Sequence, residues 1–172
     1  MRLSTDFLVE QLRQQLAESA RTAIRSGRDA RDVAQGSSEY AEKREDARST
    51  IEFSNLAHAE GRRVAELRSS IDALDSWASS RRPTYDDDQA VGLGAIIEAM
   101  AETEHGVTSK TFVLLPSGAG SELTGPGGDG IISVISPASP VGRAMKGKRV
   151  GDVAEVVVRG EPGDWEILEV WS

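Results

Sequence analysis

The 172-residue chain is predicted to adopt an α+β fold, in which an antiparallel helical hairpin precedes a small antiparallel β domain with one short helix. Two observations lead to this prediction. Residues 5–79 contain no proline and are rich in alanine, arginine, glutamate, leucine and glutamine, which are strong helix formers. After Pro83, glycine, proline and alternating β-branched residues become frequent, as is typical of strands joined by turns.

Two apolar stripes indicate that the helical region holds two amphipathic helices. Apolar residues recur at spacings of three and four, which places them on one face of each helix. Because the other faces are polar, each helix needs a partner to cover its stripe, and the sequence predicts an antiparallel coiled coil. The first stripe contains Leu8, Leu12, Leu16, Ala20, Ala23 and Ile24, and the second contains Phe53, Ala57, Val64, Leu67, Ile71 and Leu74.

The break between the helices is expected at Gln35-Gly36-Ser37-Ser38, where the apolar periodicity stops and small turn-forming residues gather. Each arm would then hold about 35 residues and extend about 50 Å, at 1.5 Å per residue. Gly27 and Gly61 lie inside the arms, where each is expected to cost up to about 1 kcal/mol relative to alanine. We therefore expect some local loosening at both glycines.

Composition divides the chain into a coiled-coil hairpin (residues 1–80), a linker (81–90) and a β domain (91–172). Pro83 stops the second helix, and the aspartates that follow it stay solvated. Strands are expected at residues 94–100, 110–115, 131–135, 154–158 and 165–170, with an irregular loop at 116–130. Residues 139–146 are expected to form the short helix, with Ser139 as N-cap and Pro140 at the first helical position.

The charge is unevenly distributed along the chain. The net charge is -8, yet residues 1–82 carry 14 Lys/Arg and 14 Asp/Glu, while residues 83–172 carry 6 and 14. Because phosphate contacts dominate duplex affinity, this balance argues against independent, sequence-specific DNA binding and favours a protein partner. There is no cysteine, so disulfides and thiolate metal sites are excluded. With no membrane-spanning run and no signal peptide at the start, a cytoplasmic protein is expected.

The most specific stretch runs from Ile135 to Asp152. It contains Ser139-Pro140-Val141-Gly142-Arg143-Ala144-Met145-Lys146-Gly147-Lys148, followed by Gly151-Asp152. This stretch resembles the signature of the Gre transcript cleavage factors, Ser-Pro-x-[Ala/Gly]-Arg-[Ala/Gly]-[Leu/Met]-x-Gly-Lys followed by Gly-Asp. Trp165–Val170 resembles the final strand of that family, and Glu60–Leu67 resembles its descending helical arm. The resemblance thus spans both halves of the chain.

The resemblance implies a coiled-coil finger and an FKBP-like C-terminal domain that docks on the rim of the RNA polymerase secondary channel. Ser139, Pro140, Gly142 and Arg143 are the residues expected to contact the polymerase. The finger would enter the channel, approach the nascent RNA 3′ end, and help hold a polymerase Mg²⁺ while backtracked RNA is cleaved. The chain would then be no enzyme itself, with no metal or cofactor of its own.

The acids of the finger tip depart from the family pattern. Family members carry Asp-x-x-Glu there, and the nearest equivalent in this chain is the pair Glu39 and Glu42, with the same spacing. Carboxylates suit Mg²⁺, which prefers hard oxygen ligands. Glutamate in place of aspartate lengthens one side chain by a methylene, which would shift the geometry of the metal ligands. Asp32, Glu45 and Asp46 are nearby acids that would substitute if the turn lies elsewhere.

The sequence also allows simpler interpretations of these residues and other functions for the chain. Glu39 and Glu42 would also suit the positive start of a helix as solvated side chains, and the Ser139 motif would also serve as a cap that packs one helical turn. Besides cleavage stimulation, the same fold would suit a non-cleaving regulator that occupies the channel. A third hypothesis is a coiled-coil adaptor whose β domain binds another protein, since fold does not imply function.

Overall fold

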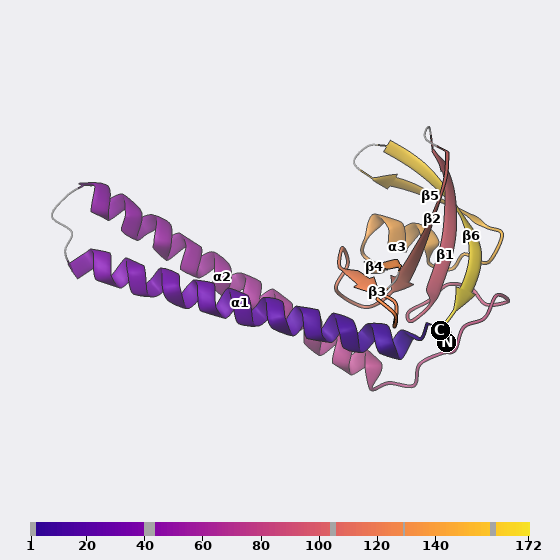
Figure 1. Ribbon diagram of the computed structural model, residues 1–172, viewed down its shortest axis with the longest axis horizontal. Coiled ribbons are helices and arrows are strands. Elements are labelled where there is room, and N and C mark those ends of the chain that lie inside the picture. The colour runs from indigo at the N-terminus through magenta and orange to yellow at the C-terminus, as the bar shows by residue number, and fades with distance from the viewer. Residues whose placement is uncertain (1–2, 40–43, 104–105, 129, 159–160) are drawn as a thin grey trace. The chain divides into compact units, whose positions relative to one another are not determined.

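The computed structural model describes residues 3–39, 44–103, 106–128, 130–158 and 161–172. Two long helices come first, α1 (Thr5–Glu39) and α2 (Arg44–Ala78), and a six-stranded sheet with one short helix, α3 (Pro140–Met145), follows (Figure 1). This arrangement confirms the predicted α+β class. The strands are β1 (Ile96–Thr103), β2 (Gly106–Leu114), β3 (Glu122–Thr124), β4 (Ile131–Ile135), β5 (Val153–Val158) and β6 (Glu161–Trp171).

The chain divides into two compact units. The hairpin unit comprises residues 14–72, and the sheet unit comprises residues 1–13 and 73–172. The sheet unit therefore includes the first turns of α1 and the last turns of α2. These two units are defined by which residues lie close together in space, whereas the expected division into residues 1–80, 81–90 and 91–172 is based on composition along the chain. Whether those three segments behave as separate domains stays a prediction.

Burial in the hairpin unit follows the predicted stripe on α1 and, less completely, the stripe on α2. Leu16, Ala20 and Ala23 are buried on α1, and Ala57 is buried on α2. Ile24, however, is 46% exposed, so its assignment to the stripe is wrong. Adjacent helical residues point about 100° apart, so Ala23 and Ile24 do not both face the partner helix. In the second stripe, Phe53, Val64, Leu67 and Ile71 are half-buried.

The helical break does not lie at residues 35–38, because α1 continues to Glu39 and α2 begins at Arg44. The residues expected to form the turn are therefore part of α1. Glycine costs about 1 kcal/mol relative to alanine in a helix and serine about half of that, which is too little to end a long helix. Residues 40–43, which connect the two helices, lie outside the described part of the chain.

The sheet has the order β3-β4-β2-β1-β6-β5. Its neighbouring strands are antiparallel except β2 and β4, which pair in parallel with Val113 opposite Val134. The expectation of a wholly antiparallel sheet is therefore wrong in this one pairing. Parallel neighbours need a long connection, and residues 115–130 supply it. Alternating burial identifies the two faces of a strand, but it carries no information on the direction of the neighbouring strand.

The expected irregular loop at residues 116–130 contains the short strand β3, which lies at one edge of the sheet. Leu123 is fully buried there, between the exposed residues Glu122 and Thr124. A single buried residue is too short a pattern to reveal a period of two. For this reason the sequence did not indicate the strand.

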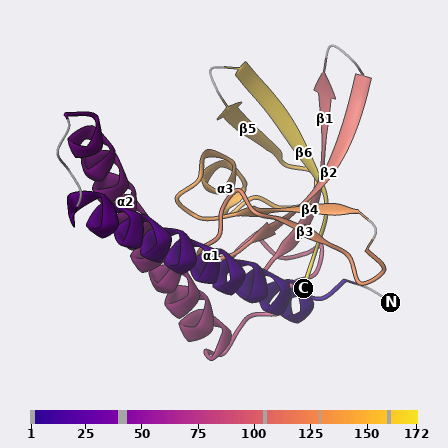
Figure 2. The same cartoon turned by 60° about the vertical axis from the view of Figure 1, so that its left-hand side comes forward.

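The sheet is buried on both faces near the start of β1, because successive residues of a strand point to opposite sides. Ile97 belongs to the core that contains Met145 of α3, and Ile96, which points the other way, is also fully buried. The β1–β2 and β5–β6 hairpins extend together away from the short strands β3 and β4 (Figure 2). Other members of the α3-side core are Ala99, Phe112, Leu114, Ile167 and Val170.

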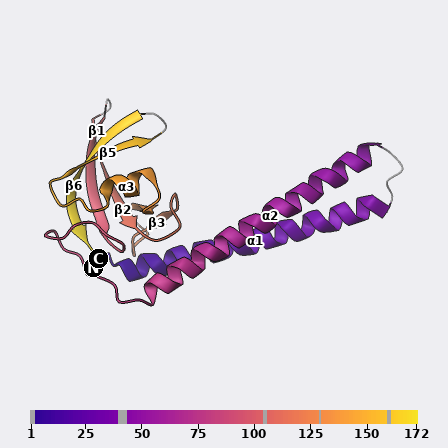
Figure 3. The same cartoon turned by 180° about the vertical axis from the view of Figure 1, so that it is seen from behind.

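The first turns of α1 are attached to the rest of the sheet unit by side-chain hydrogen bonds. Thr5 Oγ1 donates to the Gly94 carbonyl at 2.7 Å. Gln11 Nε2 donates to Thr124 Oγ1 at 3.1 Å, and the Thr124 N–H donates to Gln11 Oε1 at 2.9 Å. Trp171 Nε1 donates to the Leu3 carbonyl at 3.1 Å, so the first described residue and the end of β6 lie side by side (Figure 3).

Candidate functional site

Ser139 organises the segment that leads into α3. Its hydroxyl accepts hydrogen bonds from the N–H groups of Gly142 (3.1 Å) and Ser136 (3.2 Å), and it donates to the Ser136 carbonyl at 2.8 Å. The bond from Gly142 satisfies one of the N–H groups that the start of a helix leaves unpaired. Pro140 occupies the first turn of α3. Both residues therefore have the local helix-starting roles that the sequence predicts.

Gly142 is buried against the backbone of Ser136. A Cβ atom on Gly142 would stand 2.0 Å from the Ser136 carbonyl oxygen and 2.7 Å from its carbonyl carbon. Real Cβ atoms do not approach other heavy atoms so closely, so this position accepts only glycine without a backbone shift. Gly142 thus shapes the loop, and its burial gives it a packing role; its contact with a partner stays a prediction.

Pro140 and Arg143 are the exposed members of the four predicted contact residues. Arg143 Nη1 donates to the Ala138 carbonyl at 3.0 Å, which holds the side chain close to the loop. A guanidinium has five N–H donors, so one such bond leaves others for a partner. Two of the four residues, Pro140 and Arg143, are therefore exposed, while the contacts of Ser139 and Gly142 hold the loop in shape. A partner contact of any of the four stays a prediction.

The end of the motif is anchored to neighbouring backbone. The Gly147 N–H donates to the Val91 carbonyl at 2.8 Å, and the Val91 N–H donates to the Lys148 carbonyl at 2.8 Å. Gly147 has φ +82°, a conformation that glycine adopts without a steric penalty. The Gly151 N–H then donates to the Ile167 carbonyl at 2.8 Å. The Gly-Lys and Gly-Asp parts of the motif therefore have structural roles that sequence reasoning missed.

A basic surface follows α3 in an otherwise acidic half of the chain. Residues 131–151 contain no Asp or Glu, and four of the six Lys/Arg residues found after residue 82 lie between 143 and 149. We call this group the basic loop; it consists of Arg143, Lys146 and Arg149, which are exposed, and Lys148, which is half-buried. Its concentration of positive charge suits carboxylates on a partner. The clustering is visible in the sequence, although the predicted contact set included only Arg143.

The structure leaves the predicted tip acids untested. Glu39 is the last residue of α1, but its side chain lies outside the described part of the chain, as does the whole of Glu42. Asp32 is exposed on α1. Glu45 and Asp46 belong to the first turn of α2, and their side chains are also outside the described part. A role of any of these acids in holding Mg²⁺ stays a prediction.

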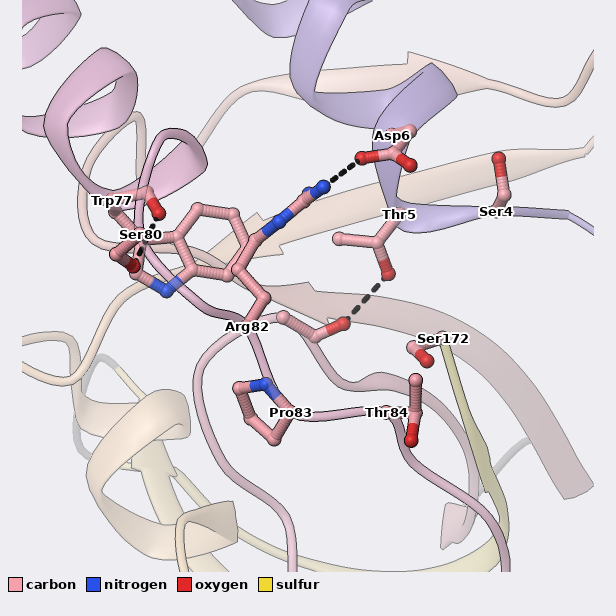
Figure 4. A pocket seen from close by; sticks show the side chains of 10 residues that line it. Ser4, Thr5, Asp6, Trp77, Ser80, Arg82, Pro83, Thr84 and Ser172 are labelled. Carbon is pink, nitrogen blue, oxygen red and sulfur yellow. Dashed lines mark hydrogen bonds and ion pairs between the residues drawn. The ribbon is translucent and has the colours of Figure 1, made fainter.

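A cavity of about 350 Å³ in the sheet unit lies where the start of α1, the end of α2 and the linker meet (Figure 4). Arg82 forms an ion pair with Asp6 at 2.5 Å, and its guanidinium lies 5.5 Å from the centre of the Trp77 ring. Because the opposite charges of Asp6 and Arg82 pair with each other, they are not left to bind a ligand. We therefore interpret the cavity as the place where these three segments pack together. The sequence offered no signal for this joint, since Asp6 and Arg82 are far apart along the chain.

None of the helices in the described ranges is both long and apolar enough to cross a membrane. A family model of the transcription elongation factors GreA and GreB, covering their C-terminal part, matches residues 87–172, which is half of this chain. The match includes β1–β6, α3 and the basic loop. A comparison with curated proteins finds no match.

Solved structures that resemble the chain include the following three. The GreA factor homolog 1 (Gfh1) protein of Thermus thermophilus is 21% identical over 95% of this chain and 94% of its own, with a TM-score of 0.39. A structure of the transcription factor Gfh1 is 20% identical over 93% of each chain, with a TM-score of 0.38. Gfh1 of Thermus aquaticus is 18% identical over 92% of this chain and 93% of its own, with a TM-score of 0.33.

Proposed function

Because this chain belongs to the GreA/GreB family of transcription elongation factors, we propose that it binds RNA polymerase and stimulates cleavage of backtracked RNA. The sheet unit would dock at the rim of the secondary channel, and the hairpin would enter the channel. The family match carries the proposal, because it covers residues 87–172 and so includes α3 and the basic loop.

The basic loop is the part of the sheet unit that we propose contacts the polymerase. It gathers most of the positive charge of residues 83–172 next to the exposed residue Pro140. The rest of that segment is strongly acidic. A local charge of one sign in a background of the other orients a protein as it approaches its partner. Carboxylates on the polymerase surface are the groups that this loop would recognise.

The tip acids are the proposed contribution of the hairpin to the reaction. Glu39 ends α1 and Glu42 lies in the connection to α2, so both belong to the closed end of the hairpin. Within the hairpin unit, residues 14–39 of α1 and 44–72 of α2 form the two arms, so each arm is about 40 Å long at 1.5 Å per residue. Two carboxylates offer the hard oxygen ligands that suit Mg²⁺, an ion that activates water and stabilises charge on a phosphate. The catalyst would remain the polymerase.

Replacing the tip acids tests this role directly. We expect the protein to shorten the RNA in stalled elongation complexes, and the Glu39→Ala, Glu42→Ala double variant to slow that cleavage about 100-fold, because the stabilising carboxylates are lost. The RNA is sized on a gel after incubation with Mg²⁺, and polymerase binding is measured separately. Glu52→Ala, which removes an exposed acid from the side of α2, is the matched control and should cleave normally.

Unshortened RNA together with tight polymerase binding would overturn the cleavage proposal in favour of a non-cleaving regulator that occupies the channel. One observation favours that alternative, namely that the first acid of the pair is Glu39 and not the aspartate of the family pattern. Absence of polymerase binding would overturn both functions and leave the adaptor hypothesis.

Charge reversal in the basic loop tests the proposed docking surface. We expect the double variant Arg143→Glu, Lys146→Glu to weaken polymerase binding about tenfold, because attraction to carboxylates becomes repulsion. The loss should shrink at high salt, which screens exposed charges. Binding is measured by fluorescence anisotropy of labelled protein. Arg81→Glu reverses one charge at an exposed linker residue, where the double variant reverses two, and should leave the affinity unchanged, so a comparable loss in this control would contradict a specific docking role.

A further inference from the structure

Glu60 is a charged residue placed where the two arms of the hairpin unit meet. Its Oε2 atom is buried and has no hydrogen-bond partner among the described residues, while Oε1 receives a long hydrogen bond of 3.5 Å from Ser26 Oγ of α1. A carboxylate oxygen that is buried without a partner costs stability, because it loses hydration and gains no hydrogen bond in return, although Glu60 as a whole is partly exposed. Such a residue in a coiled-coil seam commonly specifies which alignment of the helices forms.

Gly27 provides the space that Glu60 occupies. It is buried, and a Cβ atom on it would stand 3.2 Å from Glu60 Cβ. Gly61, by contrast, is exposed and has nothing within 4 Å of a Cβ position. The two glycines were expected to loosen the arms alike, but Gly27 is a close-approach site, and Ser26 beside it donates the hydrogen bond to Glu60.

The apolar part of the seam specifies the alignment weakly. On α1, Ala20, Ala23 and Ala30 are buried at steps of three and seven residues, and Ala57 is buried on α2. Sliding α2 along this part of α1 by a helical turn, about 5.4 Å, replaces one buried alanine of α1 by another. The alanines of α1 therefore distinguish weakly between alignments, although larger residues such as Leu16 and Phe53 also belong to the two stripes.

Glu60 distinguishes between those alignments. A slide of one turn would place it against Ala23 or Ala30, and each of these carries a Cβ that Gly27 lacks. Ala30 is flanked by Asp29, which would repel the carboxylate, and by Arg31, which would attract it, so the steric difference from Gly27 carries the discrimination there. Arg63 and Glu18 are the charged groups that line the cavity of about 480 Å³ around Glu60 in the observed alignment.

We infer that Glu60 is a positioning residue, which sets the register of α1 against α2 at a cost in stability. This inference rests on the proposed function for its consequence: the register decides which residues stand at the closed end of the hairpin, and therefore where Glu39 and Glu42 are presented. This role requires three features: a carboxylate or amide at position 60, the hydroxyl of Ser26, and the absence of a side chain at Gly27.

Distance measurement between the arms tests the inference. The chain has no cysteine, so spin labels on Gln35→Cys and Arg48→Cys, at exposed positions of α1 and α2, mark the arms uniquely. In this background we expect a single narrow distance. Adding Glu60→Leu should raise the Tm by about 3 °C, since the uncompensated carboxylate is gone, yet broaden or split the distance distribution by about 5 Å. Glu60→Gln keeps the hydrogen bond to Ser26 and should retain the single distance.

One control variant tests whether the change in distance is specific to position 60, and the cleavage assay separates this inference from the proposed function. Glu66→Leu, at an exposed position of α2, should leave the distance distribution unchanged. An unchanged narrow distance in the Glu60→Leu variant would overturn the inference. If the register broadens as expected, Glu60→Leu should lower RNA cleavage with polymerase binding unchanged. If the unmodified protein cleaves no RNA, the proposed function fails, while the distance measurement still decides the role of Glu60.

Discussion

The Gly142→Ala variant is expected to lose about 3 kcal/mol of its free energy of unfolding, because the added methyl group has no space. The new Cβ would lie 2.0 Å from the Ser136 carbonyl oxygen, which is backbone and not the end of a flexible side chain. Overpacking of this kind typically costs about 1–3 kcal/mol, and a clash with backbone belongs at the upper end. Polymerase binding should fall as well, since α3 and the basic loop would shift together.

Urea unfolding followed by tryptophan fluorescence measures this loss. All three tryptophans, Trp77, Trp165 and Trp171, belong to the sheet unit, so their signal reports on the unit that contains Gly142. Gly61→Ala is the matched control: its methyl group meets nothing within 4 Å, so this variant should stabilise its helix by up to about 1 kcal/mol and leave the tryptophan transition in place. A Gly142→Ala variant as stable as the original protein would contradict the close packing of α3.

Leu12→Ala is expected to destabilise the sheet unit by about 3 kcal/mol. Leu12 is fully buried, and its methyl carbons lie 2.8 Å from where a Cβ on Gly118 would stand. Truncation therefore leaves a cavity between the start of α1 and the backbone at residue 118. The same fluorescence measurement applies. Val107→Ala is the control, because Val107 is 67% exposed on β2 and its truncation should cost less than about 0.5 kcal/mol.

A double-mutant cycle isolates the contact between Leu12 and Gly118. Gly118→Ala alone should be strongly unfavourable, because its φ of +80° disfavours a side chain and the methyl group would meet Leu12. In the Leu12→Ala background the steric part disappears and only the backbone strain remains. The double variant should therefore be about 1 kcal/mol more stable than the sum of the single losses predicts. Strict additivity would show that the two residues do not touch.

Some features of the candidate site follow from the sequence motif, and others are seen only in the tertiary structure. The Ser139 cap and the short helix were predicted, because a hydroxyl followed by proline is a local signal that needs only a few neighbouring residues. The motif also suggested that Ser139 and Gly142 contact a partner. In the structure the hydrogen bonds of Ser139 and the close packing of Gly142 hold the loop together, and their contact with a partner stays a prediction.

Helix positions along the chain followed from the sequence by itself. The absence of proline, the alanine-rich composition and the spacing of Leu8, Leu12 and Leu16 are properties of one segment, and they predicted 35-residue helices with the correct buried face. The position of the break was wrong, because the weak preferences of Gly36 and its serine neighbours did not outweigh helix continuation.

Only the tertiary structure decided how distant segments meet. The parallel pairing of β2 with β4, the burial of Leu123, and the approach of Gly142 to Ser136 depend on which backbone comes alongside which. The surroundings of Gly27 and Gly61 were also decided by the tertiary structure: both lie in long helices, but Gly27 is packed against Glu60, whereas Gly61 has nothing within 4 Å of a Cβ position. Periodicity and propensity describe how a segment is ordered along its own axis. Packing between segments depends on the shapes of both, and neither segment alone contains that information.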